Sequence, residues 1–341
     1  MANVTVLLSE FVLMGFSDIW ELQVLHAVVF FLIYLTALIG NLLIILLITL
    51  DQHLHSPMHF FLRTLSLLDV CFISVTVPKA ITQSLTQNSS ISFLGCAVQV
   101  FLVVLFACAE LALLTVMSYD RYVAMCHPLH YQVMMRKGAC EKMVAASWFS
   151  GAVSGFLNTS VTSLPFCWSD VIHQFFCEIP SLLRLSYSER FLAEIGAIIA
   201  TTSLGILRFT SILVSYPYIF STVLRIPSVE GRSKVFSTCI PHLVVVIVFL
   251  STGSITYLKP TSESPSIWDL IVSVFYTVAP PTLNSIVYSL KNRDMQAAFW
   301  KMLRKTVFIH RNNKSNNNNT ATSLSSGKRK ANSVSNSHPP I

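Results

Sequence analysis

The sequence predicts an all-α membrane protein, a seven-transmembrane helix bundle followed by a short interfacial eighth helix. Three observations predict this fold class: a charge-poor composition, seven long apolar windows and an uneven distribution of basic residues. Of the 341 residues, 53% are hydrophobic and 11% are charged, whereas soluble domains carry about 25% charged residues. A chain this apolar needs lipid as the solvent for much of its surface.

Each apolar window exceeds the roughly 20 residues that a helix needs to cross a bilayer. Three windows contain no Asp, Glu, Lys or Arg, and they are Leu22–Leu50, Met143–Ser169 and Val235–Leu258. The other four carry few charges or are cleanly bounded, and they are Met58–Ala80, Gly95–Met125, Phe191–Leu224 and Trp268–Leu290. The windows divide the chain into an N-terminal segment (1–23), a seven-helix domain (24–290), an amphipathic cytosolic helix (291–306) and a disordered cytosolic tail (307–341).

Lys and Arg residues in the connecting segments and at the window ends orient the bundle. With the N-terminus outside, the inner side holds seven of them before position 291 and ten from there onward, against four on the outer side. Basic residues collect on the cytosolic side of membranes, so we expect an extracellular N-terminus and a cytosolic C-terminus. Asn3 then lies outside, in an Asn-Val-Thr triplet that can be glycosylated. The flank before the first window is acidic, which is untypical of a cleaved signal peptide.

The segment after the seventh window is amphipathic. Met295, Ala298, Phe299 and Leu303 share one helical face, with basic residues opposite, as in a helix that lies along the cytosolic membrane surface. The following residues are rich in Asn and Ser and lack any apolar period, so the tail is predicted to be disordered.

Short motifs add a resemblance to this pattern. Asp120-Arg121-Tyr122 ends the third window, Gly40-Asn41 lies in the first, "LSLLD" in the second and "PPTLNSIVYSLKNRD" in the seventh. Together with seven helices they resemble a rhodopsin-like G-protein-coupled receptor. The stretches "PMHFFLRTLSLLDVCF", "MSYDRYVAMCHPLHY", "SYPYI" and "GRSKVFSTCIPHL" are similar to the odorant receptor family, from about Leu8 to Trp300.

The resemblance implies a function. The protein is then expected to be an odorant receptor of the plasma membrane and not an enzyme. It binds small, mostly hydrophobic volatile ligands within the bundle and activates a stimulatory, olfactory-type heterotrimeric G protein, which raises cyclic AMP. The expected partners are an odorant, this G protein and membrane lipid, without nucleic acid, and no cofactor is expected beyond a sodium ion.

Arg121 is the residue on which the expected coupling mechanism depends. An arginine at the membrane face is costly and should be paired, so we expect Asp120 and nearby polar groups to hold it at rest. On activation it would turn toward Tyr216 and admit a helix of the G protein. The resemblance assigns coupling and activation to Asp120, Arg121, Tyr122, Tyr216, Lys234, His242 and Tyr288.

Two acids, Asp69 and Glu110, lie deep in the apolar windows. Buried carboxylates must be paired, protonated or bound to a cation. The family resemblance implies that Asn41 and Asn284 lie near these two acids. The four residues then form a sodium site, or one acid is protonated and hydrogen-bonded to the other. The sequence leaves both alternatives open.

The family pattern also implies a ligand site in the outer half of the bundle. Its set is apolar with a few hydroxyl groups and no charge, which suits a hydrophobic molecule with one polar handle and not an amine. The residues are Val103, Val104, Ala107, Cys108, Thr201, Leu204, Leu250, Gly253, Ser254, Tyr257 and Thr277.

The chain departs from the family pattern at several positions. Leu250 and Ser251 stand where Tyr-Gly is usual, so a tyrosine proposed to relay ligand contact is absent. Ser285 follows Asn284 where a proline is usual, although Pro280-Pro281 lies one turn earlier. Arg208 falls in the middle of the fifth window without an evident partner.

Eight cysteines are present, of which Cys96, Cys167 and Cys177 are placed on the outer, oxidising side. The resemblance implies a Cys96–Cys177 disulfide. The family's usual partner for Cys167 is replaced by Tyr187, so Cys167 is expected to be free or to pair with more than one partner.

A transporter or channel is the rival interpretation, because Asp69, Glu110 and Arg208 could line a charged path. Against it, the sequence shows no internal repeat and no ring of acids or repeated filter sequence. An enzyme is disfavoured because neither H-E-x-x-H nor G-x-S-x-G occurs.

Overall fold

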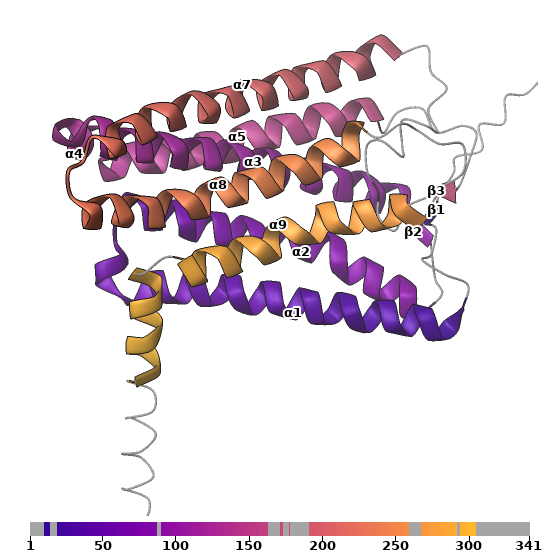
Figure 1. Ribbon diagram of the computed structural model, residues 1–341. Helices are drawn as coiled ribbons and strands as arrows, with labels where there is room; N and C mark the ends of the chain where they lie inside the picture. The colour runs from indigo at the N-terminus through magenta and orange to yellow at the C-terminus, as the bar shows by residue number, and fades with distance from the viewer. Residues whose placement is uncertain are drawn as a thin grey trace, which may run out of the picture. The chain divides into compact units, whose positions relative to one another are not determined.

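Seven long helices run side by side in the described part of the chain (Figure 1). The structure is a computed structural model that describes residues 10–13, 19–86, 90–162, 171–172, 177, 191–258, 267–291 and 294–304. The long helices are α1 (Trp20–Leu50), α2 (Pro57–Thr86), α3 (Phe93–Cys126), α5 (Lys137–Thr162), α7 (Phe191–Leu224), α8 (Val229–Leu258) and α9 (Ile267–Lys291).

Short elements join some of these helices. The turns η1 (Gln52–Leu54) and η2 (Pro128–His130) and the helix α4 (Tyr131–Met134) lie at one end of the bundle, which we call the α4 end. The chain falls into two compact units, Met1–Arg293 and Asp294–Ile341. The second unit contains a helix over residues 294–304, inside the segment for which the sequence predicts an amphipathic helix.

The predicted windows correspond to the observed helices. Within the described residues, α1, α2, α3, α7 and α8 are apolar and long enough by themselves to cross a bilayer. The remaining two, α5 with 26 residues and α9 with 25, reach about 37–39 Å at 1.5 Å per residue. Apolar windows delimit the lipid-facing core only, so α2 and α8 extend beyond their predicted ends into more polar sequence.

Small residues bring α3 and α5 together. Gly151 and Gly155 lie one turn apart on the face of α5 that meets α3. A Cβ atom at Gly155 would lie 2.8 Å from the carbonyl oxygen of Phe101, and one at Gly151 would collide with that of Leu105. In lipid, where apolar side chains gain little from contact with one another, such close backbone approach supplies much of the packing between helices.

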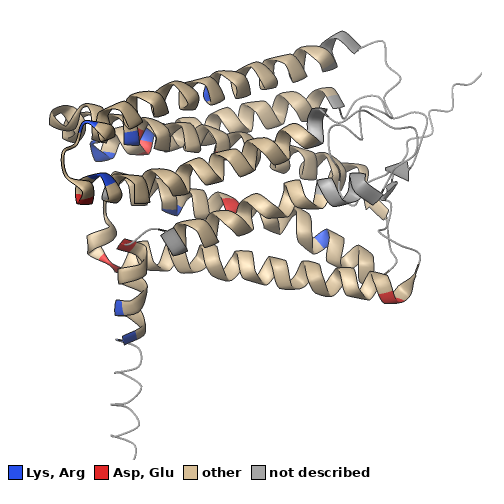
Figure 2. Cartoon of the chain, viewed as in Figure 1, with Lys and Arg blue, Asp and Glu red and all other residues tan. Residues whose placement is uncertain are grey.

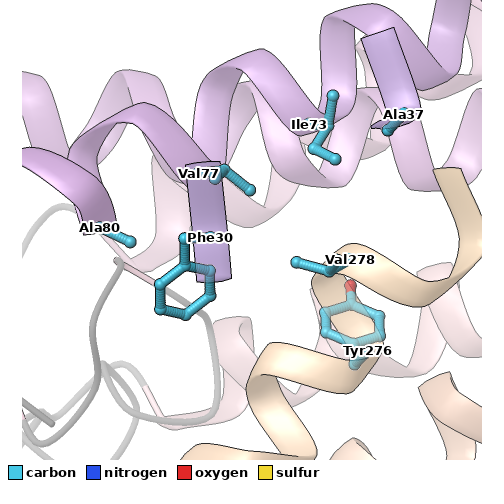
Figure 3. Close-up of a cluster of buried hydrophobic side chains, with 7 residues drawn as sticks. All are labelled: Phe30, Ala37, Ile73, Val77, Ala80, Tyr276 and Val278. Atoms are coloured by element: carbon cyan, nitrogen blue, oxygen red, sulfur yellow. The ribbon is translucent and has the colours of Figure 1, made fainter. Parts of the chain in front are cut away.

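A hydrophobic cluster joins α1, α2 and α9 (Figure 3). Phe30 of α1 and Tyr276 of α9 are its large side chains, and both are buried. Its smaller members are Ala37, Ile73, Val77, Ala80 and Val278. This packing fixes the helices that carry the buried polar residues described below.

Three short strands form a sheet at the end of the bundle opposite α4, which we call the sheet end (Figure 1). They are β1 (Glu10–Leu13), β2 (Ser90–Ser92) and β3 (Val171–Ile172), in the order β2-β1-β3. Strand β1 pairs antiparallel with β2 and parallel with β3. This sheet is not predictable from the sequence, because strands of two to four residues are too short to show an alternating pattern.

The disulfide at the sheet end joins Cys96 to Cys177, with the two Cα atoms 5.5 Å apart. This pairing confirms the prediction. The backbone N–H of Cys177 also donates to Gln99 Oε1 at 3.0 Å, and Gln99 Nε2 donates to the carbonyl oxygen of Val75 at 3.1 Å. Residue 177 is therefore tied to α3 and, through Gln99, to α2. Asn3, Cys167 and Tyr187 lie outside the described residues.

Cys177→Ser should strongly reduce delivery of the protein to the cell surface. The disulfide links residues 81 positions apart, and closing a loop of that length is worth roughly 4–5 kcal/mol in the chain-entropy treatment. Surface labelling of an N-terminal epitope measures the effect. Cys71→Ser is the matched control, because Cys71 is a half-buried free cysteine. Normal surface delivery of Cys177→Ser, or peptide mapping that finds Cys167 bonded to Cys177, would contradict the assignment.

Candidate functional site

Asn284 stands between two buried acids at the centre of the bundle. Its side-chain Nδ2 donates to both carboxylate oxygens of Asp69, at 3.1 and 3.2 Å, and to Glu110 Oε1 at 2.9 Å. All three side chains are buried. They come from α9, α2 and α3, so one amide group links three helices. We call these three residues the Asn284 centre.

The Asn284 centre brings together three of the four residues grouped from the sequence, Asp69, Glu110 and Asn284, but with a different bond pattern. The two carboxylates do not bond to each other; the amide bridges them. Asn41 joins α1 to α9 by donating to the carbonyl oxygen of Pro281 at 2.9 Å. Its own Oδ1 is buried and has no hydrogen-bond partner.

The oxygen atoms of this centre are suitable ligands for a hard monovalent cation. Carboxylate and amide oxygens are the ligands that such ions take. No cluster of three or more His, Cys, Asp or Glu residues suited to a metal ion occurs in the described part of the chain. The centre can alternatively hold a proton, because two carboxylates that share one partner do not both ionise readily.

Charged residues gather at the α4 end (Figure 2), where Arg121 is buried on α3. No direct hydrogen bond or ion pair joins Arg121 to Asp120 in the described residues, although the charge of Arg121 acts on the Asp120 carboxylate. Among the described residues no ion pair within 4.0 Å involves Arg121, and Arg121 Nε and Nη2 have no hydrogen-bond partner. Neighbouring residues on a helix point in different directions, which disfavours a direct bond between these two side chains.

Asp120 has another partner. The hydroxyl group of Tyr131 in α4 donates to Asp120 Oδ1 at 2.9 Å. Burial, together with the nearby Asp120 carboxylate, raises the pKa of Tyr131, so the phenol stays protonated and remains a donor at neutral pH. Asp120 thus holds the short segment after α3 and leaves the guanidinium of Arg121 available.

A second hydrogen bond closes the space beside Arg121. Tyr216 of α7 and His242 of α8 are stacked, and the Tyr216 hydroxyl group lies 2.7 Å from His242 Nδ1. His242 Nε2 lies 2.9 Å from the carbonyl oxygen of Leu114 on α3. Arg121 is within electrostatic reach of Tyr216, His242 and Tyr288. We call this three-helix connection the Tyr216–His242 link.

The structure places the other predicted coupling residues as follows. The Tyr122 hydroxyl group lies 3.2 Å from His127 Nε2, at the exit of α3. Tyr288 is buried and its hydroxyl group has no hydrogen-bond partner. The backbone of Lys234 lies in α8, and its side chain is outside the described atoms.

The predicted ligand set is only partly enclosed. Val103, Val104 and Thr277 are buried, whereas Leu204 is 43% exposed and Ser254 is exposed. The remaining members are half-buried, and they are Ala107, Cys108, Thr201, Leu250 and Gly253. A Cβ atom at Gly253 would meet no heavy atom within 4 Å, so there is room beside α8. The Tyr257 side chain lies outside the described atoms.

Two polar contacts near this set were missed by the sequence analysis. Asn158 Nδ2 of α5 donates to Thr201 Oγ1 at 2.8 Å, and Arg208 Nη1 of α7 donates to the carbonyl oxygen of Cys108 at 3.4 Å. Asn158 follows Gly151 and Gly155 on α5 at helical spacing, which could have placed it toward the neighbouring helices. Neither partner could be read from the sequence, because the pairs lie 43 and 100 residues apart.

The fold defines the class of this protein. The chain is similar to the crystal structure of squid rhodopsin with a TM-score of 0.69 over 84% of this chain and 81% of that one. At 16% identity, the likeness shows the fold alone: a rhodopsin-like membrane bundle.

Sequence comparison gives the family. The olfactory receptor family model matches residues 30–306. Olfactory receptor 14L1 of Homo sapiens is 58% identical over 85% of this chain and 90% of its own length. Olfactory receptors 14A16 and 14J1 of Homo sapiens are 53% and 54% identical, each over 89% of this chain and over 98% and 95% of their own lengths. The chain belongs to the olfactory receptor family; it is a multi-pass membrane receptor and not an enzyme.

Tyr131→Phe should raise signalling in the absence of ligand. The change removes the hydroxyl group that donates to Asp120 and leaves the aromatic ring in place, so the segment after α3 loses its tie to the end of that helix. Ligand-free cyclic AMP, normalised to surface receptor, measures the effect. Tyr119→Phe is the control, because no hydrogen bond is found for its hydroxyl group. Equal ligand-free signalling from the two variants would show that the Tyr131–Asp120 bond does not restrain the receptor.

Proposed function

We propose that this receptor binds a small odorant within the helix bundle and activates a stimulatory, olfactory-type heterotrimeric G protein, which raises cyclic AMP. The observation that carries the proposal is Arg121, a buried arginine at the α4 end whose Nε and Nη2 atoms have no hydrogen-bond partner. Burying an unsatisfied guanidinium is costly. In a second conformation, a partner that supplies hydrogen-bond acceptors would satisfy the guanidinium and so favour that conformation.

The proposed orientation places the α4 end in the cytosol and the sheet end outside the cell. The disulfide at the sheet end supports it, because disulfides persist in oxidising compartments. The distribution of Lys and Arg supports it independently. The receptor then lies in the plasma membrane with Asn3 available for glycosylation, and residues 291–306 and 307–341 lie on the cytosolic side as an amphipathic helix and a polar tail.

The coupling step is a change of hydrogen-bond partners at the Tyr216–His242 link. In the described conformation the Tyr216 hydroxyl group is bonded to His242, and His242 holds α8 against α3 through Leu114. Outward movement of α8 breaks the bond to Leu114 and separates His242 from Tyr216. The freed Tyr216 can then accept a hydrogen bond from Arg121, and the space between α3, α7 and α8 opens for a helix of the G protein.

Arg121→Ala should abolish the cyclic AMP response to an activating odorant while leaving surface delivery largely intact. The change removes the group that engages Tyr216 in the open state, and it also removes a costly buried charge, so folding should not suffer. Dose–response curves and surface labelling in the same cells separate the two effects. Arg136→Ala is the control, since Arg136 is an exposed arginine near the same end. A full response from Arg121→Ala would remove the basis of the coupling proposal.

We place the odorant site between α3, α7, α8 and α9, around the residues predicted from the family pattern. Buried Val103 and Val104 form an apolar wall on α3, and the half-buried Ala107 and Cys108 follow on the next turn. Asn158 holds the Thr201 hydroxyl group in place, which leaves that group's own proton to donate to a ligand. Such a site binds a small apolar molecule with one polar group.

Ala107→Leu should lower the potency of odorants or shift the response to smaller ones. Three added carbon atoms fill space at this position, and overpacking costs about 1–3 kcal/mol, equivalent to roughly 5- to 150-fold in potency. Responses to a homologous odorant series measure the change. Val98→Leu, at a position on α3 that is 47% exposed, is the control. An unchanged response profile in Ala107→Leu would move the site elsewhere.

We also propose that the Asn284 centre binds sodium and so favours the closed state. The carboxylates of Asp69 and Glu110 would hold the ion, with Asn41 Oδ1 as a further oxygen. Its positive charge would offset the repulsion between two buried acids. A shared proton is the alternative that the same geometry allows.

Replacing choline with sodium should raise the thermal stability of the purified receptor, and Glu110→Gln should remove that dependence. The substitution keeps the size of the side chain and deletes one negative charge, so the cation loses much of its attraction. Thermal unfolding in matched sodium and choline salts is the measurement. Asn158→Ser, in another part of the bundle, should keep the sodium response. A wild-type receptor that is equally stable in both salts would favour the shared proton.

A further inference from the structure

Arg208 is a charge in the middle of an apolar helix. It lies 17 residues after the start of α7 and 16 before its end, about 24–26 Å from either end at 1.5 Å per residue. Its guanidinium therefore cannot reach water by extending along the helix. The only acid on α7 is Glu194, 14 residues earlier and about 21 Å away along the axis. A guanidinium in this position needs a partner from elsewhere.

The described part of the chain offers Arg208 no negative partner. Its hydrogen bond to the carbonyl oxygen of Cys108 is long, at 3.4 Å, and that oxygen belongs to a helical peptide group of α3. Asp69 and Glu110 are bonded to Asn284, and no ion pair within 4.0 Å involves Arg208 among the described residues. Most of the N–H groups of Arg208 are therefore available to bind a ligand.

The surroundings of Arg208 form a polar patch shared by three helices. The Cys108 thiol lies beside both the guanidinium of Arg208 and the hydroxyl group of Ser154 on α5. One turn further along α5, Asn158 positions the Thr201 hydroxyl group. Cys108 and Thr201 also belong to the set proposed to bind the odorant, so this patch borders the ligand site.

We propose that Arg208 binds an anionic group of the ligand, so that the odorants of this receptor include carboxylic acids. The inference rests on the odorant site proposed above and gives it a chemical class. A guanidinium presents parallel N–H donors that match the two oxygens of a carboxylate, and the ligand supplies the negative charge that the chain lacks here. The apolar wall formed by Val103 and Val104 takes the hydrocarbon part of the acid.

A carboxylate of this kind could come from a short odorant acid or from a fatty acid of the bilayer. Chain length separates the two sources. The test uses straight-chain acids of 4 to 18 carbons, each compared with the alcohol and the methyl ester of the same length. A response to short acids identifies an odorant, whereas a response confined to 16 and 18 carbons identifies a membrane fatty acid as the ligand of Arg208.

The decisive quantity is the ratio of the potency of an acid to that of its methyl ester, measured by cyclic AMP in the same cells. Differences in expression and coupling cancel in this ratio. The wild-type receptor should prefer the acid by about 10- to 100-fold, as expected for losing a charge-assisted hydrogen bond. Arg208→Gln should bring the ratio to about one and Arg208→Lys should give an intermediate value, whereas Arg63→Gln, a matched change on α2, should keep the preference.

The thermal unfolding temperature of the purified receptor measures ligand binding in the absence of a G protein. Short acids should raise the unfolding temperature of the wild type and of Arg63→Gln, but not of Arg208→Gln. Stabilisation by acids without cyclic AMP would leave the inference standing and count against the coupling proposal. Equal effects of acid and ester, an acid preference that survives Arg208→Gln, or an absence of any effect from every acid would overturn the inference.

Discussion

The hydrogen bonds of Asn284 are the constraint on which the rest of the bundle depends. In lipid, a buried carboxylate without a partner is among the most costly features that a fold can contain. Here a single amide donates to Asp69 and Glu110 together and thereby links α2, α3 and α9. The apolar cluster around Phe30 and Tyr276 then packs α1 against two of these helices. Positions nearer either end follow from this central anchoring.

Helix contacts on the other side of α3 are of two kinds. Gly151 and Gly155 let α5 approach α3 closely. This is a packing contact between backbones, and it cannot be exchanged for a contact with another group. The Tyr216–His242 link, in contrast, consists of hydrogen bonds that can be exchanged. The close packing holds α5 against α3, whereas the proposed coupling step requires the exchangeable bonds of α7 and α8 to break. A receptor needs both, because a ligand can shift only an equilibrium between discrete arrangements.

The sequence predicts the elements of this fold better than their contacts. Long apolar windows locate the helices because lipid imposes length and composition directly, and the motif resemblance leads to the Cys96–Cys177 pair. Adjacency in sequence misleads for Asp120 and Arg121, which form no direct bond, and Asp120 accepts a hydrogen bond from Tyr131 instead. Nothing local could reveal the contact of Arg208 with Cys108, since the two lie 100 residues apart. Asn3, Cys167 and the tail lie outside the described residues, so those expectations stay predictions.

The central claim is that the buried polar groups link helices and transmit ligand binding, and that they do not conduct ions. A continuous charged path would favour an ion pair between Arg208 and Asp69 or Glu110. Within the described residues, no such ion pair is formed. The direct measurement is nucleotide exchange on a purified G protein by the receptor in lipid vesicles, with ion flux recorded in the same vesicles. The account predicts odorant-dependent exchange without flux. Flux without exchange would contradict it.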